Sequence, residues 1–139
     1  MNIEEARLIA KELVQRSKIA FVGSVDSLGF PNIKAMLNLY HEGISSFGFS
    51  TNTSSKRVQQ FNMNKKSSIY FCDDEKYLGL LLVGNMEVTR NKEMRNKLWF
   101  DGSELFYPLG IDDPDYSVIF FTTMNCDLYT GKEIIQFDP

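Results

Sequence analysis

The sequence predicts one α+β domain in which most of the chain forms an antiparallel sheet or barrel. Its 139 residues are enough to enclose one hydrophobic core. Strand-like runs follow one another through short turns, without the alternation of strands and helices that builds a parallel sheet. Gly79 and Gly84 fall inside one long strand-like run, where glycines are typical of the bends or bulges that curl a sheet. We therefore expect residues 1–139 to form a single curled domain.

The chain is predicted to begin with a helix and to continue as strands. Residues 3–16 carry an apolar stripe at helical spacing, and Asn2 can cap the helix. A strand follows at residues 19–25, and turn-forming residues separate it from a second strand at residues 32–40. One face of this second strand is apolar and carries Ile33, Ala35, Leu37 and Leu39, whereas the other carries Lys34, Met36, Asn38 and Tyr40.

The later elements follow from the same signals. A hairpin turn at residues 41–43 leads into a strand that begins at Phe47. A helix follows with either Ser54 or Ser55 as its N-cap, and Val58 and Phe61 share one face of it. Residues 102–115 are expected to be irregular. The remaining predicted elements are strands at residues 67–72, 77–89 and 116–125, a helix at residues 91–99, and short strands at residues 127–129 and 134–137.

Composition excludes several classes of function. The net charge of −3 gives no overall basic field that would gather nucleic acid. No apolar run approaches the length that spans a membrane, and the first residues lack the features of a secretory signal. Cys72 and Cys126 lie in strand-like runs and are predicted to be buried free thiols. These observations predict a cytoplasmic protein without nucleic-acid or membrane partners.

Residues 50–57 read Ser-Thr-Asn-Thr-Ser-Ser-Lys-Arg and join a strand to a helix. A helix N-terminus presents free backbone N–H groups and the positive end of the helix dipole. The hydroxyl groups of this loop and the charges of Lys56 and Arg57 would add more donors in the same place, which suits a phosphate group. An exposed strand-to-helix connection has a similar composition, so the loop alone leaves both interpretations open.

The common catalytic motifs are missing from the sequence. There is no glycine-rich nucleotide loop, no Gly-x-Ser-x-Gly and no Cys-x-x-Cys, and the single histidine, His41, falls in the predicted hairpin turn. Residues 112–115 (Asp-Asp-Pro-Asp) suggest a cation site, but turn formation and capping explain them at least as well, and no metal site is expected. A phosphate loop without strong catalytic side chains points to a bound organic cofactor.

Two segments resemble a known family. Residues 49–52 (Phe-Ser-Thr-Asn) and 55–57 (Ser-Lys-Arg) resemble the flavin-phosphate loop of the pyridoxamine 5′-phosphate oxidase-like FMN-binding split barrels. Trp99 and the later run at residues 106–115 (Phe-Tyr-Pro-Leu-Gly-Ile-Asp-Asp-Pro-Asp) resemble a signature of one branch, the general stress protein 26 family. The resemblance spans residues 19–129 in the right order.

The resemblance implies a six-stranded antiparallel split β-barrel with flanking helices, which forms a homodimer with FMN at the subunit interface. It places residues 34–37 along the isoalloxazine ring, where Lys34 would polarise the N1/C2=O edge or remain a solvated strand lysine. Residues 77–80 would approach from the partner subunit. Trp99, Phe106 and Tyr107 would be interface or pocket aromatics, with plain core packing as the alternative for each and the favoured one for Trp99. The implied cofactor-binding set is Lys34, Ala35, Met36, Leu37, Ser50, Thr51, Ser55, Lys56, Arg57, Tyr77, Gly79, Trp99 and Tyr107.

The sequence departs from the pyridoxamine phosphate oxidases proper in ways that bear on the substrate. It has no C-terminal arginine- and histidine-containing substrate segment, and Gly79 stands where those oxidases use a glutamine against the ring. We expect an FMN-dependent oxidoreductase with a small-molecule electron donor or acceptor, an unknown substrate and no identifiable catalytic residue. The alternative is a non-catalytic FMN-binding or redox-sensing stress protein. A lesser variant holds haem or a deazaflavin instead.

Overall fold

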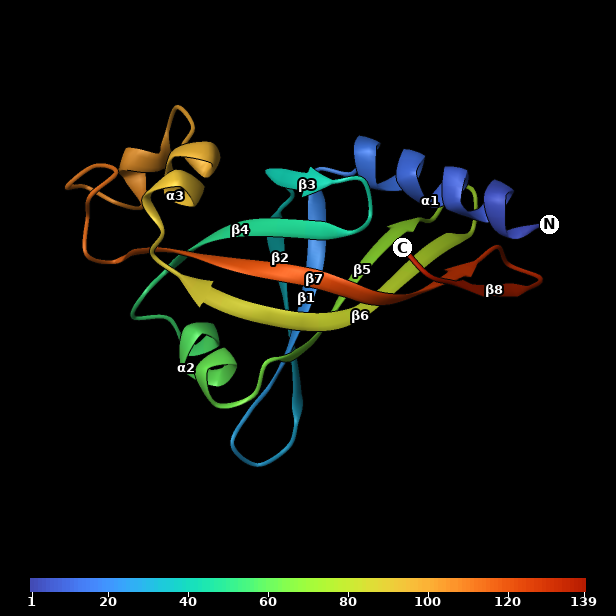
Figure 1. Cartoon of the computed structure of the whole chain (residues 1–139), viewed down its shortest axis with the longest axis horizontal. Helices are drawn as coiled ribbons and strands as arrows, with labels where there is room; N and C mark the ends of the chain where they lie inside the picture. Colours follow the sequence, from blue (N-terminus) through green and yellow to red (C-terminus); the bar gives the residue numbers. More distant parts are fainter.

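A computed structural model describes all of residues 1–139 (Figure 1). Three α-helices and one short 3-10 helix accompany eight strands, and every strand pairing is antiparallel. In chain order, the elements are α1 (Ile3–Arg16), β1 (Ile19–Val25), β2 (Pro31–Leu37), β3 (Tyr40–Glu42), β4 (Ser46–Asn52), α2 (Lys56–Met63), β5 (Lys66–Asp73), β6 (Leu78–Thr89), α3 (Lys92–Leu98), η1 (Ser103–Leu105), β7 (Tyr116–Tyr129) and β8 (Ile134–Phe137).

The strands form one sheet that curls on itself into a half-barrel. Their order is β2-β1-β5-β6-β7-β4-β3, and β8 pairs with β7. The two edge strands, β2 and β3, are joined by only Asn38 and Leu39. Because each residue spans at most about 3.8 Å, this link holds the two edges of the sheet close together. The expectation of a curled antiparallel sheet is confirmed, whereas the expected count of six strands is wrong, because the sheet has eight.

The main hydrophobic core fills the inside of the curled sheet. Phe47, Phe71 and Phe121 are fully buried there, and the rings of Phe71 and Phe121 lie 5.7 and 6.2 Å from the ring of Phe47. Burial of each such ring stabilises the fold by about 1.5–3 kcal/mol. Helix α1 packs against β5 and β8 near the two chain ends, whereas α3 and the irregular segment after it lie at the opposite end of the sheet (Figure 1).

The predicted strand at residues 32–40 is two strands instead of one. The Asn38 side chain donates hydrogen bonds of 3.0 Å to the carbonyl oxygens of Val14 and Ser17, at the end of α1. These bonds turn the chain between β2 and β3, so the alternation of faces does not continue beyond β2. A side-chain contact with a distant helix therefore ends the strand, and strand periodicity alone does not reveal such a contact.

Other elements differ from their predictions by small amounts. His41 lies in β3 instead of the turn, and its ring centre is 5.9 Å from that of Phe47. Tyr77 lies in the turn before β6, with a φ of 53°. The predicted strands at residues 116–125 and 127–129 are one continuous strand, β7.

The two glycines of β6 have different roles. The register shifts between Val83 and Gly84, as expected for a bulge, and a side chain at Gly84 would overlap the backbone of Thr122. Gly79, in contrast, keeps a regular register with both neighbouring strands. A side chain at this position would overlap the hydroxyl of Tyr70 unless that side chain moved, so the glycine here leaves room for Tyr70 and does not mark a bend.

The two cysteines also differ. Cys126 is buried as predicted, and burial raises the pKa of its thiol to about 11. Cys72 is exposed, so the prediction that both thiols are buried is wrong, because β5 turns this position away from the core. None of the helices has the length and apolar character needed to cross a membrane.

Candidate functional site

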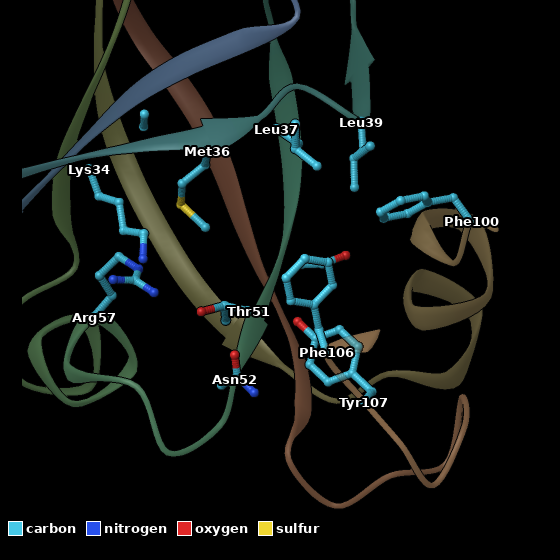
Figure 2. A pocket seen from close by; sticks show the side chains of 12 residues that line it. Lys34, Met36, Leu37, Leu39, Thr51, Asn52, Arg57, Phe100, Phe106 and Tyr107 are labelled. Carbon is cyan, nitrogen blue, oxygen red and sulfur yellow. The ribbon is translucent and has the colours of Figure 1, made fainter. Parts of the chain in front are cut away.

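A pocket of about 200 Å³ lies where the two edges of the half-barrel come together. Strands β2 and β4, the start of α2 and the segment around η1 contribute to its walls (Figure 2). The residues that line it are Lys34, Ala35, Met36, Leu37, Leu39, Ser50, Thr51, Asn52, Arg57, Phe100, Phe106 and Tyr107.

One end of the pocket is basic. Lys34 from β2 and Arg57 from α2 extend toward the same space (Figure 2), and neither forms an ion pair with a carboxylate of the chain. Arg57 Nε is buried and has no hydrogen-bond partner. Burial lowers the pKa of Arg57, because the charged guanidinium loses hydration. A buried charged group without a partner is costly, so this end of the pocket is suited to an anion.

A smaller hollow of about 180 Å³ continues from the basic end. It shares Lys34 and Arg57 with the pocket and adds Lys56, which brings three positive charges to the N-terminus of α2. Ser55 caps this helix, since its Oγ accepts a hydrogen bond of 3.3 Å from the backbone N–H of Val58. The helix dipole and the three cations therefore act on the same small volume.

The other end of the pocket is aromatic. Phe100, Phe106 and Tyr107 stand across the pocket from the two basic side chains (Figure 2). Tyr107 is buried, and its ring centre lies 4.5 Å from that of Tyr116 and 6.2 Å from that of Trp99. Burial raises the pKa of Tyr107 to about 12, so its hydroxyl stays protonated at neutral pH.

The acidic segment at residues 112–115 forms hydrogen bonds within the chain. The Asp113 carboxylate accepts from the backbone N–H groups of Leu109 (3.1 Å) and Asp115 (2.9 Å). The Asp115 carboxylate accepts from Asn52 Nδ2 (2.7 Å) and from the backbone N–H of Ser54 (2.8 Å). The bonds to Asp113 are local turn bonds, whereas those to Asp115 come from a distant loop. No group of three or more His, Cys, Asp or Glu side chains is placed to hold a metal ion.

The sequence and the fold agree with one family. The sequence profile of pyridoxamine 5′-phosphate oxidase matches residues 9–128. The chain belongs to the pyridoxamine 5′-phosphate oxidase-like family. A Clostridium acetobutylicum protein related to general stress protein 26 of Bacillus subtilis, of the pyridoxinephosphate oxidase family, is 43% identical. That comparison covers 99% of this chain and 96% of the other, with a TM-score of 0.88.

More distant structures share only the fold of this family. General stress protein 26 from Bacillus anthracis is 16% identical, with 99% of this chain and 100% of the other covered and a TM-score of 0.78. A heme-binding protein from Mycobacterium smegmatis is 13% identical, with a TM-score of 0.76, over 96% of this chain and 57% of the other. No curated protein matches the chain.

Eight of the thirteen family-implied residues come together in the pocket. They are Lys34, Ala35, Met36, Leu37, Ser50, Thr51, Arg57 and Tyr107. Ser55 and Lys56 lie beside the basic end, as the helix cap and as part of the adjoining hollow. Trp99 does not line the pocket, and it packs behind Tyr107 against Tyr116, which is the core-packing alternative.

Tyr77 and Gly79 lie away from this pocket in the same chain. Gly79 is on the outer face of the sheet, and a Cβ at this position would point toward the Tyr70 hydroxyl. Tyr77 is exposed in the preceding turn. The family resemblance predicts that both residues approach the cofactor from a second subunit. This role stays a prediction, because the structure contains one subunit.

Sequence reasoning missed two lining residues, Leu39 and Phe100. Leu39 belongs to the short link between β2 and β3, and Phe100 follows α3 directly. Asn52 also stood in a recognised segment without being assigned to the site, whereas Phe106 was expected to be an interface or pocket aromatic and does line the pocket.

Proposed function

We propose that the chain binds FMN in this pocket, with the phosphate held at the basic end. The observation that carries the proposal is the set of unsatisfied groups there: Arg57 Nε is buried without a partner, and Lys34 and Arg57 have no counter-ion. A phosphate dianion accepts several charge-assisted hydrogen bonds and would satisfy these groups together. The hydroxyl groups and the N-terminus of α2 would complete the cradle.

We further propose that the protein is a flavin-dependent oxidoreductase with a small-molecule electron donor or acceptor. A bound flavin supplies hydride and electron transfer, and the pocket lining contains no Asp, Glu, His or Cys that would act as acid, base or nucleophile. The side chains would therefore bind and orient. Phe100 and Phe106 would exclude water from the apolar end, and the protonated Tyr107 would offer a hydrogen-bond donor.

A homodimer that completes the site is part of the proposal. The outer face of the sheet exposes large apolar side chains, including Ile33, whose exposed fraction is 74%, together with Phe21, Leu37 and Met124. Patches of this kind are typical of protein interfaces. The pocket of about 200 Å³ is smaller than the 300–1,000 Å³ that is common for ligand sites. A second subunit that packs at the β2 edge would add a further wall and enlarge the enclosed space enough for a flavin.

Haem is a weaker candidate for this pocket. The Mycobacterium smegmatis neighbour is a heme-binding protein, but its likeness at 13% identity concerns the fold. The only histidine, His41, lies in β3 and is not among the lining residues, and no cysteine lines the pocket either. Of the side-chain types that ligate haem iron, only Met36 and Tyr107 line the pocket, and burial keeps the Tyr107 hydroxyl protonated, whereas donors for phosphate are abundant.

The first experiment is an absorbance spectrum of the purified protein with and without added FMN, followed by gel filtration. Flavin bands that co-elute with a dimer would support the cofactor and the assembly, and a colourless protein that does not retain FMN would overturn them. Reduction of the bound flavin by NADH or NADPH and reoxidation with turnover would support the oxidoreductase. Tight binding without turnover with any acceptor would favour the non-catalytic FMN-binding or redox-sensing protein.

A further inference from the structure

The loop that precedes α2 is held by a segment sixty residues further along the chain. Asn52 Nδ2 and the backbone N–H of Ser54 donate to the two different oxygens of the Asp115 carboxylate, at 2.7 and 2.8 Å. The backbone N–H of Thr53 donates to the Asp115 carbonyl oxygen at 2.8 Å. Asp115 therefore contacts three consecutive residues of the loop.

These contacts fix the groups that build the basic end of the pocket. Asn52 itself lines the pocket, and the three residues that follow Ser54 are the α2 cap and the two cations of the helix N-terminus. Asp115 does not line the pocket, so its carboxylate does not reach a ligand there. The hydrogen bonds to Asn52 and to the backbone of Ser54 hold the pKa of Asp115 below its usual range.

The segment that carries Asp115 is itself anchored to the aromatic end. Asp113 accepts hydrogen bonds from the backbone of Leu109 and of Asp115, and the Asp113 carbonyl accepts one from Arg90 at 3.2 Å. The same stretch of chain continues back to Tyr107 in the pocket wall. A rigid segment thus connects the two ends of the pocket behind its surface.

We infer that Asp115 is a positioning residue, which holds the residue 52–54 loop so that the N-terminus of α2 meets the phosphate of the ligand. The inference rests on the proposed function, since it concerns how the same pocket receives a phosphorylated ligand. It gives the Asp-Asp-Pro-Asp segment a role in recognition that involves neither a cation nor direct contact with the ligand. A loop that is ordered before binding loses less entropy when the phosphate arrives.

The test compares ligands with and without a phosphate in the Asp115→Asn variant. Asparagine has the same size but turns an N–H₂ group toward one of the two donors, so at least one hydrogen bond is lost. We expect the Kd for FMN to rise about tenfold and the Kd for riboflavin to change less than about twofold. Inorganic phosphate should raise the Tm of the wild-type protein more than that of the variant.

The control is Asp74→Asn, which removes an exposed carboxylate that makes no hydrogen bond or ion pair through its side chain. It should leave all three measurements unchanged. Asp115→Glu, which keeps the charge, should recover part of the FMN affinity. An equal loss of FMN and riboflavin affinity in Asp115→Asn would indicate a general structural role and overturn the inference, as would unchanged affinity for FMN.

The inference and the proposed function can fail separately. If wild-type protein binds FMN and Asp115→Asn binds it equally well, the positioning role is wrong and FMN binding stands. If wild-type protein does not bind FMN but phosphate raises its Tm, and raises that of Asp115→Asn less, the positioning role stands and the cofactor is wrong. If wild-type protein responds to neither ligand, both are overturned.

Discussion

The two ends of the pocket are built on opposite principles. At the basic end, Arg57 Nε is buried without a partner, and Lys34 and Arg57 have no counter-ion. At the aromatic end, Tyr107 packs tightly against Tyr116 and Trp99. The basic end therefore carries an energetic cost in the free protein, which a ligand would relieve, whereas the aromatic end stabilises the fold whether or not a ligand is bound. Substitutions at the two ends should consequently separate binding from stability.

The largest effect should come from Tyr107→Ala. Removal of this buried ring leaves a cavity beside Tyr116 and Trp99, and truncation of a buried aromatic residue costs about 3–5 kcal/mol. Chemical unfolding should show this loss, and the Kd values for FMN and riboflavin should rise together. Tyr107→Phe is the control, because it keeps the ring and removes only the hydroxyl. A stable Tyr107→Ala variant would contradict the view that this end belongs to the core.

Arg57→Ala should weaken FMN binding without lowering the stability of the free protein. Loss of the charge-assisted hydrogen bonds to phosphate should raise the Kd for FMN about a hundredfold, or about 3 kcal/mol, and leave riboflavin binding nearly unchanged. The Tm of the free protein should stay the same or rise, because an unpaired, half-buried charge is removed. Fluorescence titration and thermal unfolding measure both quantities, with the exposed Lys76→Ala as control. A lower Tm with unchanged FMN affinity would remove Arg57 from the site.

The same contrast explains what the sequence could predict about the site. The basic end depends on consecutive residues, since residues 50–57 contain the strand end, the helix cap and two cations in one short motif. The aromatic end depends on residues spread from Leu39 to Tyr107, and only the family resemblance pointed to any of them. Leu39 and Phe100 reach the pocket through the path of the chain after β2 and after α3, and no local pattern encodes that path.

The fold was predicted where local patterning controls it. Antiparallel pairing and the bulge at Gly84 followed from short turns and from glycine in a strand. The division of the predicted strand at residues 32–40 did not, because it depends on hydrogen bonds from Asn38 to the end of α1. The number of strands depends on such long-range contacts as well, which is why the expected count was too low.

Lys34→Met sharpens the boundary between the two ends. The Lys34 side chain extends toward Arg57, so we expect it to contact the phosphate, and its loss should raise the Kd for FMN about tenfold without changing that for riboflavin (Figure 2). Lys66→Met, on an exposed position of β5, is the matched control. An equal loss of affinity for both ligands, with a shift in the flavin reduction potential, would instead place Lys34 at the ring.

The smallest effect is a pH dependence that Tyr107 gives to the aromatic end. The unfolded chain releases the Tyr107 proton near pH 10, whereas burial raises the pKa of Tyr107 in the folded chain to about 12. The contribution of this group to stability is therefore fully present below about pH 10 and is lost as the pH rises toward about 12. Urea unfolding between pH 8 and about 11 should show a decline that is shallower in Tyr107→Phe. The remaining decline would come partly from Cys126, whose pKa is also raised by burial, to about 11. Identical slopes of unfolding free energy against pH for wild type and Tyr107→Phe would mean that the Tyr107 hydroxyl is hydrated in the folded protein. The inference that the aromatic end excludes water would then be wrong.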